Sequence, residues 1–239
     1  PLTDGGSIVV GNALREEWTE VCPAEAGAEI YLVGNPPYLG SNLQADEQKD
    51  DLRIVFQSQT KAYKKLDYVA CWYAKAAAYN KATDAEAAFV ATNSICQGEQ
   101  VCILWPIIYS FEQEISFAYT SFKWRNNAAK NAAVICVIVG IRRAGSPGKK
   151  IYNDDRSYPS SNINPYLTDA PTVIVFPTSS PVSLPSMSFG NQFLDGGNLI
   201  FSDGEKAELV KDFPISAPLF KQVLGSRELI QGDVRHCLW

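Results

Sequence analysis

Residues 30–38 read Ile-Tyr-Leu-Val-Gly-Asn-Pro-Pro-Tyr, and this stretch decides the predicted fold. Its first four residues form an apolar run that ends at a glycine, which is typical of a buried parallel strand. Pro36 and Pro37 then hold the backbone extended, because each proline fixes its own φ and removes an amide donor. A rigid turn at the carboxyl end of a strand lies where open α/β sheets bind ligands.

Patterns along the first two thirds of the chain predict strands that alternate with helices. Apolar runs predict strands at residues 8–10, 87–91, 115–119 and 132–141, and helical spacing predicts helices at 14–21, 63–79 and 99–109. Polar residues 123–131 separate the last two strands and indicate a hairpin tip. We therefore predict an α/β fold whose sheet is mostly parallel with an antiparallel C-terminal hairpin.

The composition changes after residue 143. Seven of the fourteen prolines lie between residues 145 and 188, together with many serines and asparagines. Such a stretch is typical of a linker that leads into a second, loop-rich unit. The predicted division is a first domain at residues 1–152, a linker at 153–188 and the start of a second α+β region at 189–239.

Length and composition exclude several classes of protein. The 239 residues are 46% hydrophobic and 20% charged, which predicts a packed core and argues against disorder. No apolar run reaches the roughly 18–20 residues that a membrane-spanning helix needs, so we expect no membrane partner. The six cysteines form no Cys-x-x-Cys pair and indicate reduced, buried thiols. His236 is the only histidine, which argues against a histidine-based triad, and we predict no metal site.

The net charge of −5 is unevenly distributed. Residues 1–53 carry ten acidic residues against three basic ones, whereas residues 115–153 carry no acidic residue. The basic residues in that second range are Lys123, Arg125, Lys130, Arg142, Arg143, Lys149 and Lys150. This basic strip is either a solvated face or a surface that contacts nucleic-acid phosphates.

The turn at residues 35–38 has the chemistry to activate an amine. The Asn35 side-chain oxygen and the Pro36 carbonyl are two acceptors on a rigid turn, and together they can accept both protons of an –NH2 group. An exocyclic base amine is a poor nucleophile because it is conjugated with its ring; these bonds localise its lone pair for attack on a sulfonium methyl. Tyr38 offers a ring for stacking. The alternative is an ordinary strand-ending turn with a core tyrosine.

Residues 35–38 resemble the Asn-Pro-Pro-Tyr motif of S-adenosylmethionine-dependent amino-methyltransferases, which act on adenine N6 or cytosine N4 in DNA and on some protein glutamines. Further stretches narrow the resemblance to the MmeI-like (Type IIL) group of fused restriction–modification enzymes. These stretches are residues 8–14 (IVVGNAL), 92–100 (TNSICQGEQ), 122–126 (FKWRN), 131–134 (NAAV), 189–191 (FGN), 195–197 (DGG) and 225–239. They are scattered over nearly the whole chain.

The resemblance implies a bacterial, cytoplasmic enzyme that transfers a methyl group from S-adenosylmethionine to adenine N6 of a base flipped out of double-stranded DNA. It implies that residues 1–152 form the second half of a Rossmann-like methyltransferase sheet and that a target-recognition region begins at residue 189. The chain contains no Gly-x-Gly cofactor loop. We therefore expect a fragment, inactive alone, whose parent polypeptide carries a nuclease portion outside this chain.

The same resemblance assigns roles to individual residues. It assigns catalysis to Asn35, Pro36, Pro37 and Tyr38, and cofactor binding to Asn12, Ala13, Asn35, Asp67 and Tyr68. Asn12 stands where related enzymes have an acidic residue, so this contact would come from an amide. It assigns stacking on the flipped base to Tyr38, Phe122 and Trp124. The alternative for Phe122 and Trp124 is packing within an edge strand. Contacts to the DNA backbone are expected from Lys123, Arg125, Lys130, Arg142 and Arg143.

Two other functions remain open from the sequence. The same amine-activating turn serves methyltransferases that act on protein glutamine or on RNA bases. The residues after the predicted linker favour DNA over these substrates, because a DNA-reading module needs that additional chain. The absence of a glycine-rich loop is also consistent with a non-catalytic DNA-specificity module. Neither the choice between adenine N6 and cytosine N4 nor the recognised bases follow from the sequence.

Overall fold

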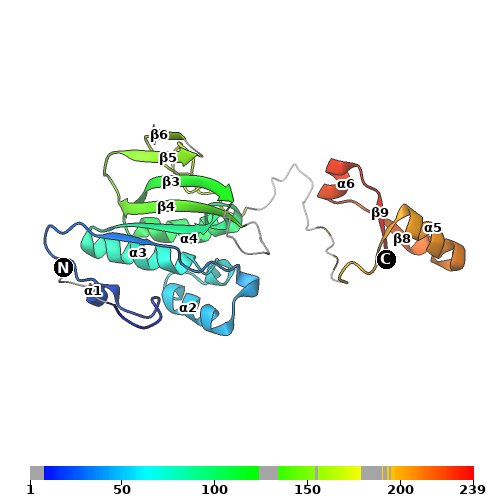
Figure 1. Ribbon diagram of the computed structural model, residues 1–239, viewed down its shortest axis with the longest axis horizontal. Helices are drawn as coiled ribbons and strands as arrows, with labels where there is room; N and C mark the ends of the chain where they lie inside the picture. The colour runs from blue at the N-terminus through cyan, green and yellow to red at the C-terminus, as the bar shows by residue number, and fades with distance from the viewer. Residues whose placement is uncertain (1–7, 124–133, 154–155, 179–189, 191–192, 194) are drawn as a thin grey trace, which may run out of the picture. The chain divides into compact units, whose positions relative to one another are not determined.

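The computed structural model describes residues 8–123, 134–153, 156–178, 190, 193 and 195–239. The chain forms two compact units, Pro1–Thr178 and Ser179–Trp239. The first unit contains a six-stranded sheet and the second a three-stranded sheet (Figure 1). In the described part of the chain, every helix is too short or too polar to cross a bilayer.

The six-stranded sheet has the strand order β1-β2-β4-β3-β5-β6. Its strands are β1 (Tyr31–Gly34), β2 (Glu86–Thr92), β3 (Gln113–Lys123), β4 (Ile135–Arg143), β5 (Lys149–Asn153) and β6 (Arg156–Ser160). The pairs β1–β2 and β3–β5 are parallel, and the other three pairings are antiparallel. Four strands therefore point the same way while β4 and β6 run opposite. The predicted α/β fold with an antiparallel hairpin is confirmed.

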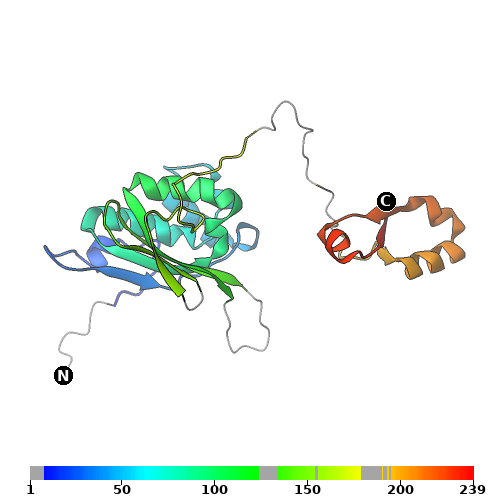
Figure 2. The same ribbon diagram turned by 90° about the horizontal axis from the view of Figure 1, so that it is seen from above.

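Two helices, α3 (Ala70–Thr83) and α4 (Gly98–Ser110), cover one face of this sheet (Figures 1 and 2). The core lies between them and the strands, with Tyr73, Trp105 and Ile108 fully buried. The Tyr73 hydroxyl donates a hydrogen bond to the Phe89 carbonyl oxygen at 2.9 Å, which ties α3 to β2. The remaining helices of this unit are α1 (Trp18–Val21), α2 (Asp46–Phe56) and the 3-10 turns η1 (Ser41–Leu43), η2 (Ala62–Lys65) and η3 (Asn93–Cys96).

The first predicted elements differ from the structure. Residues 8–10 do not form a strand, and the prediction is wrong there: Ile8 and Val10 are 88% and 97% exposed. A strand needs a hydrogen-bonded neighbour, and none lies beside these residues in the described part of the chain. The helix predicted at 14–21 is confined to α1. The helix predicted from residue 63 begins only at Ala70, after an extended residue at Leu66.

Part of the predicted linker, residues 153–188, belongs to the folded first unit. Residues 156–160 form the edge strand β6, in which Pro159 lies opposite Lys150 of β5. An edge strand tolerates proline because one of its sides needs no amide donor. Ile163 and Leu167 are buried, and the first unit extends to Thr178.

The second unit is an antiparallel sheet flanked by short helices. Its strands are β7 (Ile200–Ser202), β8 (Phe220–Val223) and β9 (Arg235–Leu238), in the order β7-β9-β8. Its helices are α5 (Asp203–Asp212), η4 (Pro214–Leu219) and α6 (Ser226–Gln231). Ser202 and Glu205 cap α5 reciprocally, because each side chain accepts the other residue's backbone N–H.

Candidate active site

The turn after β1 presents an asparagine on a fixed backbone. Gly34 ends β1, Pro36 is buried, and Asn35 is exposed. Among the described residues, the Asn35 side-chain amide has no hydrogen-bond partner. Its acceptor oxygen is therefore available to a ligand, as the proposed amine chemistry requires.

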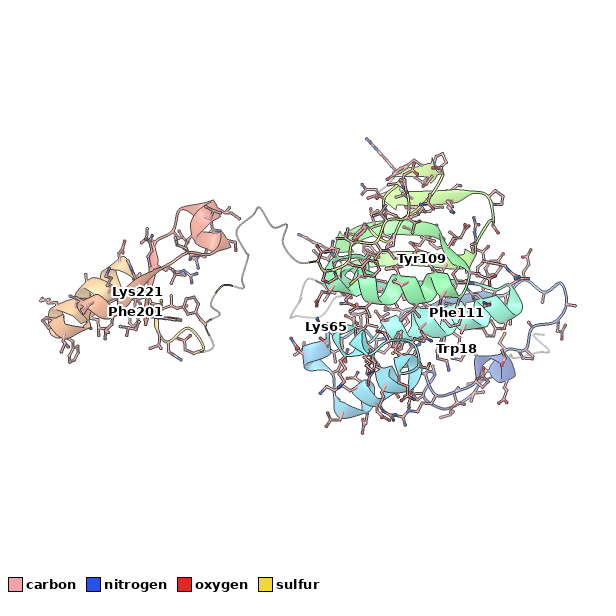
Figure 3. All side chains as sticks on the ribbon, turned by 180° about the vertical axis from the view of Figure 1, so that it is seen from behind. Trp18, Lys65, Tyr109, Phe111, Phe201 and Lys221 are labelled. Carbon is pink, nitrogen blue, oxygen red and sulfur yellow. The ribbon has the colours of Figure 1, made fainter. Side chains whose placement is uncertain are left out.

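A pocket of about 500 Å³ borders Asn35 and Pro36. Its walls come from β1, β2, α1 and α3 and include the rings of Trp18, Trp72 and Phe89. Trp18, labelled in Figure 3, is the first residue of α1 and contacts α3, with its ring centroid 6.3 Å from that of Tyr79. No charged residue lines the pocket in the described part of the chain. The site thus combines one free amide with a mainly apolar, aromatic wall.

Tyr38 lies at the ends of three neighbouring strands. The Cys136 thiol, at the start of β4, lies 3.9 Å from the Tyr38 hydroxyl oxygen. Across the sheet, Cys136 pairs in register with Thr92 of β2 and Phe122 of β3. Burial, the Cys136 thiol and the Asp67 carboxylate raise the pKa of the Tyr38 phenol, so the ring stays neutral.

The structure therefore brings Tyr38 and Phe122 to the same end of the sheet. Their roles in stacking stay predictions, and Trp124 lies outside the described residues.

Asp67 and Tyr68, two of the predicted cofactor residues, use their side chains inside the protein. Asp67 is 3% exposed, and its carboxylate accepts hydrogen bonds from the Leu39 and Val69 amides and from the Thr92 hydroxyl. The Tyr68 hydroxyl donates to the buried Asp51 carboxylate at 2.7 Å. Neither side chain lines the pocket beside Asn35.

Asn12, another predicted cofactor residue, is bound internally as well. Its amide nitrogen donates to Asp51 at 3.0 Å, and its amide oxygen accepts from the Leu14 amide at 3.0 Å. The Ala13 carbonyl oxygen accepts from the Trp18 indole N–H at 2.7 Å. The segment therefore shapes the pocket through Trp18, while the side chain of Asn12 points into a structural network.

Within the described residues, the basic strip contains ion-paired arginines and an exposed lysine. Arg142 is 12% exposed; it forms an ion pair with Glu114 at 3.1 Å and donates to the carbonyls of Ser146 and Pro147. Arg143 pairs with Asp84. Lys123 is exposed at the end of β3. Arg125 and Lys130, also predicted to contact DNA, lie outside the described residues.

Several residues of this site escape prediction from the sequence. Trp18, Trp72 and Phe89 carry no motif, and an apolar ring is more often part of the core than of a binding wall. Asp51 and Thr92 acquire their roles from partners 17 to 39 residues away along the chain. Asp51 lies among other charged residues of helix α2, so nothing in the sequence marks it as the buried one.

Comparison with known proteins gives consistent matches. Residues 1–153 match the family model described as "MmeI, DNA-methyltransferase domain", and residues 169–239 match "MmeI, target recognition domain". "DNA methyltransferase A" of Bacillus subtilis (strain 168) is 46% identical over 241 residues, covering 100% of this chain and 27% of the relative.

A solved structure is similar over the same range. The Type IIL restriction–modification enzyme MmeI in complex with DNA has a TM-score of 0.89 and 41% identity, covering 100% of this chain and 33% of that one. The chain thus spans about a third or less of the length of these relatives.

Proposed function

Because this chain belongs to the MmeI family of DNA methyltransferases and its residues 169–239 match the family's target recognition domain, we propose that it acts in methylating adenine N6 in double-stranded DNA. The methyl donor we propose is S-adenosylmethionine. The observation that carries the proposal is the exposed Asn35 amide, which has no partner in the described part of the chain and lies after β1 beside an aromatic pocket. The proposal places the enzyme in a bacterial cytoplasm, as part of a restriction–modification polypeptide.

Asn35 and Pro36 account for activation of the acceptor. The Asn35 side-chain oxygen and the Pro36 carbonyl accept the two N–H groups of the target amine, so the nitrogen lone pair is no longer shared with the ring. The two prolines fix both acceptors before the substrate arrives, which is where preorganised electrostatics lowers a barrier. The neutral Tyr38 ring stacks on the flipped base and offsets part of the few kcal/mol that unstacking costs.

The pocket beside Asn35 fits part of the methyl donor. When bound, S-adenosylmethionine supplies an electrophilic methyl carbon on a sulfonium. The rings of Trp18, Trp72 and Phe89 would hold its purine and the cationic sulfur, because aromatic faces attract both stacking rings and cations. The pocket offers no charged side chain, within the described residues, for the polar ribose and amino-acid groups.

The full-length protein that carries this chain tests the proposal. With tritiated S-adenosylmethionine and plasmid DNA, Asn35→Ala should reduce methyl transfer at least about 100-fold, the usual effect of removing one preorganised hydrogen-bonding group. The matched control is Gln59→Ala, which removes another exposed amide and should retain full activity. Digestion of the product to nucleosides should give N6-methyladenine. Near-normal transfer by Asn35→Ala would refute the mechanism, and N4-methylcytosine would refute the adenine assignment.

A further inference from the structure

The buried Asp67 carboxylate connects three segments at the edge of the candidate site. One oxygen accepts from the Leu39 amide at 2.8 Å and the Val69 amide at 3.2 Å. The other oxygen accepts from the Thr92 hydroxyl at 3.1 Å. These partners lie after the turn at residues 35–38, before helix α3 and at the end of β2. A carboxylate that is 3% exposed must have such partners, because an unpaired buried charge costs several kcal/mol.

Leu39, the residue that follows Tyr38, is held at both of its backbone polar groups. Its amide donates to Asp67, and its carbonyl oxygen accepts from the Tyr68 amide at 3.0 Å and from the Gln44 side chain at 2.8 Å. Gln44 also donates to the Leu66 carbonyl at 3.0 Å. The exit of the catalytic turn is therefore attached to residues 66–68, while the two prolines fix its centre.

We infer that Asp67 is a positioning residue for the turn at residues 35–38, acting through the backbone of Leu39. The inference rests on the proposed function for its catalytic consequence. With Thr92 as an anchor on β2, the carboxylate fixes where the chain leaves Tyr38, and so fixes the orientation of the Tyr38 ring and the Asn35 amide toward the substrate. This role replaces direct cofactor binding, because all the described bonds of the carboxylate are made inside the protein.

Hydrogen exchange of the full-length protein without DNA tests the structural half of the inference. Asp67→Ala should raise the exchange rate of the Leu39 amide at least about tenfold, because the variant removes its charged acceptor. Exchange in strand β4 should stay unchanged. Asp67→Asn should restore most of the protection, since its amide oxygen still accepts the two amides. Glu99→Ala, which removes an exposed carboxylate paired with Lys65, is the matched control.

Steady-state kinetics tests the catalytic half. With tritiated S-adenosylmethionine and plasmid DNA, Asp67→Ala should lower kcat at least about tenfold while leaving KM for S-adenosylmethionine within about twofold. Asp67→Asn should recover most of kcat. Thr92→Val removes the anchor on β2, together with a hydrogen bond of 2.6 Å between the Thr92 and Ser94 hydroxyls. It should give a smaller decrease of the same kind, and it also serves if Asp67→Ala fails to fold.

Each contrary result has a distinct meaning. Unchanged exchange at Leu39, or exchange raised equally in β4, would show that Asp67 does not position the turn. A raised KM for S-adenosylmethionine with unchanged kcat would indicate that Asp67 binds the cofactor, and would overturn the inference. Full activity of Asn35→Ala would instead refute the proposed function while leaving the exchange result valid.

Discussion

Two segments border the pocket beside Asn35, and their asparagine side chains differ in their hydrogen bonds. In residues 35–39 the backbone is fixed by prolines and by Asp67, and the Asn35 side chain has no hydrogen-bond partner among the described residues. In residues 12–18 the Asn12 side chain is bound through both its nitrogen, to Asp51, and its oxygen, to the Leu14 amide. We propose that the difference separates two uses of one residue type: Asn35 is left to bind a ligand from a rigid backbone, whereas Asn12 is satisfied internally and holds its segment in place.

The largest effects on activity and stability are expected from substituting Asn35 and Asn12, one in each segment. Asn35→Ala should lower kcat at least about 100-fold with little change in the free energy of unfolding, because it removes no internal bond. Asn12→Ala should do the reverse: it should cost about 1 kcal/mol of stability per lost hydrogen bond and change kcat only a few-fold. Urea denaturation and methyl-transfer assays on the same preparations measure both. Equal losses of stability would remove the distinction between the segments.

The second largest effect is expected at Asp51, which holds residues 12–15 from helix α2. Its carboxylate accepts from Asn12, from Arg15 at 2.8 Å and from Tyr68. Asp51→Ala leaves the buried Tyr68 hydroxyl without its acceptor, so we expect a decrease of about 1–3 kcal/mol in the free energy of unfolding.

A neighbouring carboxylate provides the control for Asp51→Ala. Asp50 lies one residue earlier, is 43% exposed and forms its ion pairs at the surface. Asp50→Ala should change the free energy of unfolding by less than about 1 kcal/mol. Comparable effects of the two variants in urea denaturation would mean that the internal bonds of residues 12–15 contribute nothing to stability.

The rigid backbone at residues 35–38 could be predicted, because it depends only on the residue types within that short stretch. Consecutive prolines after an apolar run restrict the backbone whatever surrounds them, and the apolar runs of β2 and β4 mark buried strands in the same way. Edge strand β6 could not be predicted, because Pro159 is tolerated only where one side of a strand lacks a partner. The late start of α3 could not be predicted either: Leu66 is extended, and the Asp67 carboxylate accepts the amides of Leu39 and Val69 just before the helix begins.

The candidate site could be predicted only in part, for the same reason. Sequence patterns locate Asn35 and Tyr38, but they do not distinguish a free asparagine from the bound one at Asn12. The family resemblance assigned Asp67 to cofactor binding, whereas the attachment of Asp67 to Leu39 and Thr92 depends on residues 25 to 28 positions away. Which polar atoms remain unpaired is a property of the packed structure.

The pH dependence of stability should follow the Asp51 carboxyl. Burial raises its pKa, but hydrogen bonds from Tyr68, Arg15 and Asn12 outweigh burial and hold the pKa below its ordinary value. A carboxyl with a lowered pKa in the folded state stabilises the fold above its unfolded pKa of about 4, and this contribution is lost as the pH falls through the folded value. The difference in unfolding free energy between wild type and Asp51→Asn should therefore shrink below about pH 4. A constant difference from pH 7 to pH 3 would contradict this linkage.

The smallest effects are expected in the basic strip, where an exposed lysine is compared with an ion-paired arginine. Lys123 is exposed at the end of β3, so Lys123→Ala in the full-length protein should reduce the salt slope of DNA affinity by about one.

Arg142 is bound to the Glu114 carboxylate and to two carbonyl oxygens, so Arg142→Ala should leave the salt slope unchanged. It should instead lower the free energy of unfolding by about 1–3 kcal/mol, because Glu114 loses a partner at a largely buried position. Fluorescence anisotropy with a labelled nonspecific duplex at several salt concentrations measures the slope. A slope reduced by Arg142→Ala would mean that DNA competes successfully with these internal acceptors, and that a side chain bound in the free protein still serves the ligand.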